Sequence, residues 1–178
     1  ISATGAGSVT IGGSAVGGGA YELVAHTSVA TEATSVEFAS LNDDYISYKL
    51  VMNWVLDSQQ DSYPNIRFLD GTTVLTGYAV ARIAAGNQSN STAQNDISIV
   101  YETSSFYFNS IIDIWGIGLT NSPLQVSGQS FSSTTANQIV NLGAWKAAAA
   151  GVTPDKIQIR ATWSDIPVGA KIALYGLK

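Results

Sequence analysis

The feature that most constrains the fold is a two-residue alternation of apolar and polar side chains that recurs along the chain after residue 20. It is clearest in 48–55, where Tyr48, Leu50, Met52 and Trp54 alternate with the residues between them. Side chains of this period point to opposite faces of a β-strand, and repeated alternation is typical of half-buried antiparallel strands. We therefore expect strands over 21–26, 35–38, 48–55, 97–102, 106–108, 112–114, 157–163 and 172–176.

Three further segments have a distinct local signature. Asp70-Gly71 lies between two apolar runs and predicts a tight hairpin, because both residues tolerate positive φ. The segment 86–95 (GNQSNSTAQN) has no apolar anchor and predicts a polar loop. The segment 143–151, with four consecutive alanines between two glycines, breaks the period and predicts a helical turn or an irregular loop held by Trp145.

The length and composition fit one all-β domain. The 178 residues are 46% hydrophobic and contain no cysteine, so a full core can form without disulfides. Many short strands separated by turns predict an antiparallel β-sandwich, for which a jelly-roll order is favoured. A closed up-and-down barrel is the alternative. We expect this domain to span 21–178.

Residues 1–20 (ISATGAGSVTIGGSAVGGGA) form a Gly-rich N-terminal arm of low complexity. So few apolar residues cannot offset the entropy of ordering the segment, which favours a flexible leader. The other interpretation is a connector or stalk end that is ordered only against neighbouring chains. The sequence begins with neither Met nor a signal-peptide pattern, so we expect a processed or trimmed chain.

Charge and composition disfavour several classes of function. The formal net charge is −5, and none of the 8 Lys and Arg residues is adjacent to another, so we expect no nucleic-acid partner. No apolar run is long enough to span a bilayer, and we expect no membrane insertion. With no cysteine and one histidine (His26), the chain lacks the side chains for the common metal centres, and we expect no metal and no cofactor.

Two catalytic patterns lack part of what their chemistry requires. Ser130 lies in Gly128-Gln129-Ser130-Phe131-Ser132, a near match to the nucleophile elbow, but the flanking residues predict strands on both sides instead of a strand and a helix. A glycosidase needs two facing carboxylates, whereas candidates such as Asp43, Asp44 and Asp70 lie in turn-like stretches where Asp is favoured for turn formation. We assign no catalytic residue and expect a protein that is not an enzyme.

The weak candidates for ligand binding lie in polar segments. Asp57 and Asp61 bound a stretch with alternating oxygen ligands, but it lacks the Gly and Glu of a calcium loop, so a solvated loop is favoured. Asn87 and Asn90 begin glycosylation-type triplets in the predicted polar loop. Tyr63, beside Pro64, is the aromatic residue most expected to be exposed. The other Trp and Tyr residues mostly occupy alternating strand positions, which predicts core or inter-subunit packing.

Two segments resemble a known family. They are GGGAYELVAHTSVATEATSVEFASLNDDYISYKLVMNWV, residues 17–55, and IQIRATWSDIPVGAKIALYGLK, residues 157–178. The first has a Gly-rich lead, an aromatic-Glu-Leu strand and an aromatic-rich strand, and the second has Leu-Tyr-Gly near its end. Both are similar to small β-sandwich domains of tailed-bacteriophage tail, fibre and other virion proteins, although the Trp usual after the glycines is Tyr21 here.

The resemblance implies a non-enzymatic virion structural protein, either a tail or fibre component or a capsid-decorating one. It implies location in the virion, a symmetric oligomer with a trimer favoured, docking to other virion proteins through residues 1–20, and contact with a host-surface glycan. The alternative is a carbohydrate-binding module of a secreted bacterial protein, which predicts a row of exposed Trp and Tyr on one sheet face or a bound calcium. A third hypothesis, a glycan-cleaving enzyme, predicts a cleft with two facing carboxylates.

Overall fold

The computed structural model describes residues 2–3, 9–11, 14–16, 21–55, 64–84, 87–99, 107–133, 138–162 and 165–178. All elements in these ranges are β-strands. They are β1 (Ser2–Ala3), β2 (Val9–Ile11), β3 (Ser14–Val16), β4 (Tyr21–Ser28), β5 (Ser35–Phe38), β6 (Ser47–Val55), β7 (Pro64–Asp70), β8 (Thr73–Val74), β9 (Tyr78–Ala84), β10 (Asn87–Gln94), β11 (Ile97–Ser98), β12 (Tyr107–Trp115), β13 (Leu124–Ser133), β14 (Gln138–Lys146), β15 (Lys156–Ala161) and β16 (Lys171–Leu177).

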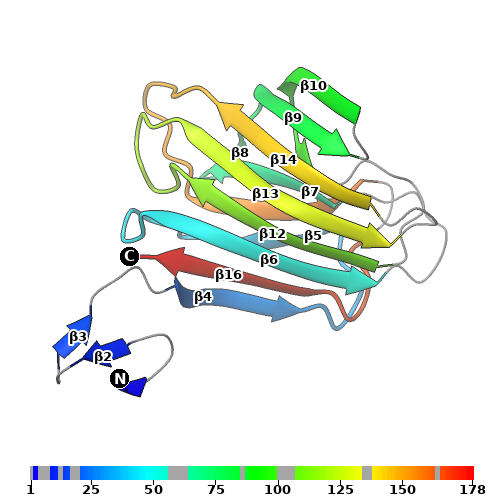
Figure 1. Ribbon diagram of the computed structural model, residues 1–178. Coiled ribbons are helices and arrows are strands. Elements are labelled where there is room, and N and C mark those ends of the chain that lie inside the picture. Colours follow the sequence, from blue (N-terminus) through cyan, green and yellow to red (C-terminus); the bar gives the residue numbers. More distant parts are fainter. Residues whose placement is uncertain are drawn as a thin grey trace.

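The strands form two antiparallel sheets that pack face to face, which confirms the predicted β-sandwich (Figure 1). The larger sheet has the order β10-β9-β14-β13-β12-β6-β16-β4. The smaller sheet has the order β11-β7-β15-β5, with β8 paired to β7. In the Gly-rich arm, β1, β2 and β3 pair with one another. Most of the other residues of the arm lie outside the described ranges, so the two interpretations of 1–20 stay predictions.

The chain passes repeatedly from one sheet to the other. Strands β4, β5, β6 and β7 alternate between the two sheets, and β15 and β16 do the same at the end of the chain. The last strand, β16, lies between β4 and β6 and pairs with both. The hairpin β9–β10 and strands β13 and β14 extend the larger sheet on the side of β12 away from β6 (Figure 1).

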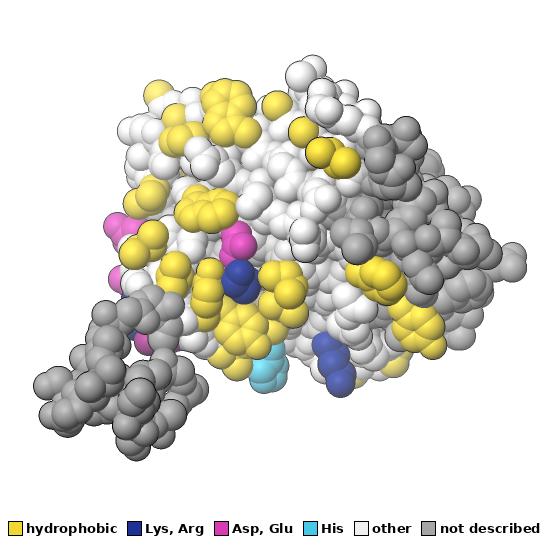
Figure 2. Space-filling model, in the orientation of Figure 1, with side chains coloured by type: hydrophobic (Ala, Val, Ile, Leu, Met, Phe, Trp, Pro, Cys, Tyr) yellow, Lys and Arg dark blue, Asp and Glu magenta, His cyan; other side chains and the backbone are white. Residues whose placement is uncertain are grey.

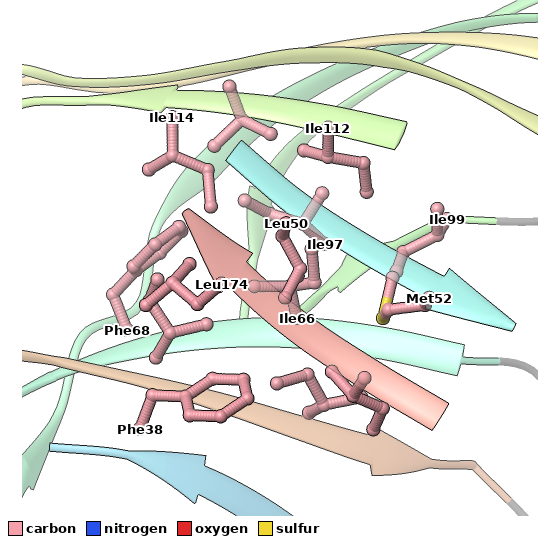
Figure 3. Close-up of a cluster of buried hydrophobic side chains, with 14 of the residues drawn as sticks. Phe38, Leu50, Met52, Ile66, Phe68, Ile97, Ile99, Ile112, Ile114 and Leu174 are labelled. Atoms are coloured by element: carbon pink, nitrogen blue, oxygen red, sulfur yellow. The ribbon is translucent and has the colours of Figure 1, made fainter. Parts of the chain in front are cut away.

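The alternation predicted from the sequence sorts side chains between the core and the outer faces. On β6, Tyr48, Leu50 and Met52 are buried, as predicted for one face of this strand. Strand β7 differs because most of its residues are buried. Figure 3 shows Leu50, Ile112 and Leu174 of the larger sheet and Ile66 and Phe68 of the smaller one around a common apolar interior. Burial of this cluster is the main favourable term for folding.

The C-terminal strand fits closely against the turn before β6. A Cβ atom at Gly176 would overlap the ring of Tyr45, so only glycine leaves room for this ring. The Tyr45 and Tyr48 rings are 5.4 Å apart, and the Tyr48 hydroxyl donates to the Asn42 carbonyl at 2.9 Å. Gly118 also approaches this turn with φ at +74°, and a side chain there would overlap the backbone of Asn42.

Two local predictions were wrong. The segment 86–95, predicted as a loop, forms β10, whose main chain pairs with β9 from Asn87 opposite Ala84 to Gln94 opposite Tyr78. An edge strand needs only one partner and no buried face, so a polar sequence suffices. Residues 143–146, predicted as the start of a helical turn or an irregular loop, belong to β14, which is held between β13 and β9. Residues 147–151 form neither helix nor strand, as the irregular-loop alternative predicted.

The Asp70-Gly71 prediction holds with a shifted register. Strands β7 and β8 pair with Asp70 opposite Thr73, so the two-residue loop is Gly71 and Thr72. Gly71 has φ at +58°, the conformation for which glycine is favoured. The predicted hairpin therefore forms, and its two-residue loop lies one residue further along the chain than predicted.

Candidate functional site

The outer face of the larger sheet carries few charges. On β16 it exposes Lys171, which lies opposite Asn53 of β6. Among the described side chains on its strands β6, β12, β13, β14 and β9, the charged ones that point outward are Lys49 and Asp113, which form an ion pair at 2.6 Å. The Lys49 ammonium also lies 4.8 Å from the ring centroid of Tyr21. Partial burial alone would lower the pKa of Lys49, but the hydrogen bond and charge of Asp113 raise it. The pair is neutral as a unit.

The outer face of the smaller sheet has the opposite character. Asp96 lies 3.1 Å from Arg67 and 3.6 Å from Arg160, and Glu37 lies 3.6 Å from Lys156. These ion pairs are partly exposed and contribute little to stability, but they keep this face hydrated. The two outer faces of the sandwich therefore differ in polarity. The outer face of the larger sheet is the one suited to contact with another molecule.

Large hydrophobic side chains are exposed on this face (Figure 2). Eight such residues of the described chain lie on it: Tyr21, Leu23, Ile83, Tyr107, Ile111, Trp115, Phe131 and Trp145. Three of them, Tyr107, Ile111 and Phe131, are 55%, 53% and 40% exposed and form what we call the apolar patch. Phe131 pairs with Asn109, which places Phe131 diagonally between Tyr107 and Ile111. A hollow of about 350 Å³ lies between Ile111 and Phe131.

A groove of about 680 Å³ lies at the other end of the same strands. Its aromatic residues are Trp115 at the end of β12 and Trp145 near the end of β14. Both are paired with Gln125 of β13, Trp115 from one side and Trp145 from the other. The two indoles and the amide therefore form one row across three strands. Trp115 is 37% exposed and Trp145 is 50% exposed.

The groove exists because the next row of the sheet carries small side chains. Ser127 pairs with Gly143, and Gly143 pairs with Ala81, so this row forms a low floor beside the tryptophans. A Cβ atom at Gly143 would meet no atom within 4 Å, so the space above its backbone is open.

Strand β10 forms the wall of the groove through Asn90, Ser91 and Thr92. Its pairing with β9 shifts register between Ser91 and Gln94, and Ala93 has φ at +58°. Such a bulge bends an edge strand and redirects its side chains. None of the residues that line the groove is charged.

The structure brings one of the predicted ligand residues to this groove. Asn90 lines its wall, and its amide oxygen accepts a hydrogen bond from Gln88 Nε2 at 3.3 Å. Asn87 begins the same strand, but its side chain is outside the described part of the chain. Asp57, Asp61 and Tyr63 also lie outside the described residues. Trp115 and Trp145 were expected in core or inter-subunit packing, and no local sequence signal indicates that they share a row.

The candidate catalytic residues occupy structural positions. Ser130 is buried in the middle of β13, with its hydroxyl 3.0 Å from that of Ser110, and it does not lie at an exposed turn. His26 is exposed on β4. Asp70 accepts a hydrogen bond from the backbone of Thr153, and the Asp44 carboxylate accepts one from the Asn42 amide.

The described residues offer neither a metal site nor a membrane-spanning helix. In these ranges, no cluster of three or more His, Asp or Glu side chains is arranged to hold a metal ion. The same ranges contain no helix long and apolar enough to cross a bilayer.

No protein-family model, no curated protein sequence and no solved structure matches the chain. The groove and the apolar patch are therefore identified as candidate sites from the geometry of this chain alone.

Proposed function

We propose that the protein is a non-enzymatic structural component of a bacteriophage particle, either a tail or fibre protein or a capsid-decorating protein, that contacts neighbouring chains and the host surface. The two sequence segments that resemble virion β-sandwich domains support this proposal. They contain β4, β5 and β6 at one end of the chain and β15 and β16 at the other. In the fold these strands are neighbours, because β16 pairs with β4 and β6, and β15 pairs with β5. The resembling segments thus belong to one structural unit.

The strand order also supports the proposal. Within the two sheets, β4-β16-β6-β12 faces β5-β15-β7-β11, so strands from the two ends of the chain interleave in both layers. We infer a jelly-roll order from this interleaving, with β9–β10 and β13–β14 as additions to one sheet. Jelly rolls are common in viral capsid and lectin domains.

The observation that carries the proposal is the apolar patch of Tyr107, Ile111 and Phe131 on a sheet face with few charges. Contiguous exposed apolar side chains on an otherwise polar surface mark sites of association. Lys49 and Asp113 neutralise each other, and Lys171 is the one further charge in the row of Phe131, so self-repulsion is small and a second copy of the chain is a suitable partner. We propose a closed symmetric oligomer, with a trimer favoured.

The oligomer is tested by measuring the mass of the purified chain with light scattering at several concentrations. We expect a trimer for the natural chain and a monomer for the Ile111→Lys/Phe131→Lys variant, because two charges would be buried without partners in the interface. Val168→Lys is the matched control, since Val168 is equally exposed but lies in the loop before β16. A natural chain that stays monomeric at high concentration would contradict the proposal.

Location in the particle is tested separately. An antiserum raised against residues 21–178 should label intact particles made from the genome that encodes the chain, viewed by electron microscopy. Labelling at the tail tip or fibres would identify a tail component, and labelling over the head would identify a decorating protein. Absence of the chain from purified particles, measured by mass spectrometry, would refute the proposal.

One observation favours a second candidate function, a carbohydrate-binding module of a secreted bacterial protein. That hypothesis predicts a row of exposed aromatic residues on one sheet face, and Trp115 and Trp145 form such a row with Gln125 between them. The two candidates differ in assembly. A chain that binds glycans as a stable monomer and is absent from particles would favour the module.

A further inference from the structure

We infer that the groove between Trp115 and Trp145 binds a neutral oligosaccharide, with sugar rings stacked on the two indoles. The inference deepens the host-surface contact in the proposed function and rests on it. It assigns a site and a chemical class of ligand to that contact.

The spacing of the two tryptophans fits a ligand made of successive rings. Because Trp115 and Trp145 lie opposite Gln125 from the two strands beside β13, their backbones are two strand spacings apart, about 9.5 Å. Both side chains leave the same face of the sheet and are exposed. Indole faces are large, rigid and apolar, and each carries an N–H donor at its edge. A pyranose ring offers the matching chemistry, with an apolar C–H face and hydroxyl groups around it.

The charge of the groove selects among ligands. Its lining contains no charged residue, and the nearest charges on this face, Lys49 and Asp113, are paired with each other. A phosphate or carboxylate ligand would require Arg or Lys. Uncharged donors and acceptors are present instead, on Gln125, Ser127 and Asn90. A binding site usually combines an apolar surface with a few such polar groups, and here they suit hydroxyls.

The floor of the groove allows close approach. Gly143 has open space above its backbone, so a ring can approach the sheet in the row beside the two indoles, over Ser127, Gly143 and Ala81. The groove volume of about 680 Å³ lies within the usual range for small-ligand sites. Strand β10 closes one side through Asn90 and Thr92, which gives the ligand a defined lateral position.

The groove is separate from the apolar patch. Ile111 and Trp115 are four residues apart on β12, about 13 Å along the strand. A neighbouring copy on the patch can therefore leave the groove open. The alternative occupant of the groove is a second copy of this chain packed on the tryptophans, and the experiment must distinguish the two.

The experiment measures binding of hexasaccharides of β-glucan, α-glucan, mannan, galactan and xylan by titration calorimetry, with oligogalacturonate as the charged comparison. We expect saturable binding of at least one neutral hexasaccharide and none of oligogalacturonate. Trp145→Ala should lower the association constant about tenfold or more, the equivalent of one stacked ring. Gly143→Val should have a similar effect because its side chain would fill the floor. Ile83→Ala is the control on the same face, because Ile83 is 48% exposed and lies in neither the groove nor the apolar patch, and it should bind as the natural chain does.

Circular dichroism and light scattering on each variant separate binding from folding and assembly. Failure of all neutral hexasaccharides to bind, or binding by Trp145→Ala and Gly143→Val that is as tight as binding by the natural chain, would overturn the inference. Conversion of an oligomer to a monomer by Trp145→Ala, without glycan binding, would also overturn it and identify the groove as a subunit interface. The oligomer test with Ile111→Lys/Phe131→Lys is independent of all these outcomes. A result against glycan binding in the groove would therefore not contradict the proposed structural role.

Discussion

Trp115 and Trp145 lie opposite the same residue, Gln125, on the strands on either side of β13. Their common row depends on the register of three strands. The inward neighbours Ile114, Val126 and Ala144 are paired in the same way and are buried, and they fix that register. A slip of one residue would turn a tryptophan into the core and an alanine outward, so core packing and groove geometry are coupled.

Glycine substitutions in the larger sheet should separate packing from groove shape. We expect Gly176→Ala to lower the free energy of unfolding by about 1–3 kcal/mol, because its Cβ would overlap the Tyr45 ring. Gly143→Ala, also in a strand but with no atom near its Cβ, should change it by less than about 0.5 kcal/mol. Urea unfolding of the two variants measures the difference. Equal effects would mean that Tyr45 moves aside without cost.

Two glycines with the same backbone angle provide a second matched pair. Gly118 and Gly151 both have φ at +74°, so alanine at either position has the same left-handed strain, about 1–2 kcal/mol. At Gly118 the new Cβ would also overlap the backbone of Asn42, whereas Gly151 has no atom within 4 Å. We expect Gly118→Ala to be the more destabilising by at least about 1 kcal/mol, measured by urea unfolding. A smaller difference between the two variants in the loss of unfolding free energy would show that the loop at Asn42 moves aside at little energetic cost.

The sequence predicted most of the strands that have one buried face, but it did not single out β9, whose Tyr78 and Val80 are buried. Alternation located β6, β12, β15 and β16 because their apolar residues face a common core. It missed β10, a polar edge strand that is held by main-chain pairing to β9. It also missed the end of β14, where Gly143 and Ala144 have little strand preference and the two neighbouring strands determine the conformation.

The candidate site was harder to predict because it depends on strand order. Asn90 was singled out from a local triplet and lies on the groove wall, but its partners come from other strands. Trp115 and Trp145 are brought together only when β12 and β14 flank β13, and local preferences do not specify that order. The small residues of the floor, such as Gly143, carry no functional signal in a sequence. They become informative once the row beside the tryptophans is known.

The buried hydroxyl pair of β12 and β13 should be energetically coupled. Ser110 and Ser130 are 3.0 Å apart inside the sandwich, and Ser110 also donates to the Gln129 carbonyl at 3.3 Å. We expect each single alanine variant to lose about 1 kcal/mol of unfolding free energy. The double variant should lose less than the sum by about 0.5–1 kcal/mol, because the shared hydrogen bond is counted once. Strict additivity in the double-mutant cycle would show that the pair does not interact.

Two buried tyrosines predict a loss of stability at alkaline pH. Burial raises the pKa of Tyr48 and Tyr78 above the ordinary 10.0, against the opposing effect of a backbone hydrogen bond at each hydroxyl. The folded chain therefore holds these protons more tightly than the unfolded chain. The resulting stabilisation is complete below pH 10 and is lost as the pH rises through the folded-state pKa values.

The measurement is the urea midpoint as a function of pH, which should be nearly constant toward about pH 10 and then fall. Lys49 titrates in the same region and has the same sign, because its pKa is also raised and its pair with Asp113 is lost on deprotonation. Lys49→Met is therefore the control, and its alkaline fall should remain. Tyr78→Phe should be less stable at neutral pH, since the Phe68 N–H loses an acceptor at 3.3 Å, but its alkaline fall should be shallower. If Tyr78→Phe and the natural chain fall in parallel while Lys49→Met stays flat, the lysine and not the phenols governs the transition.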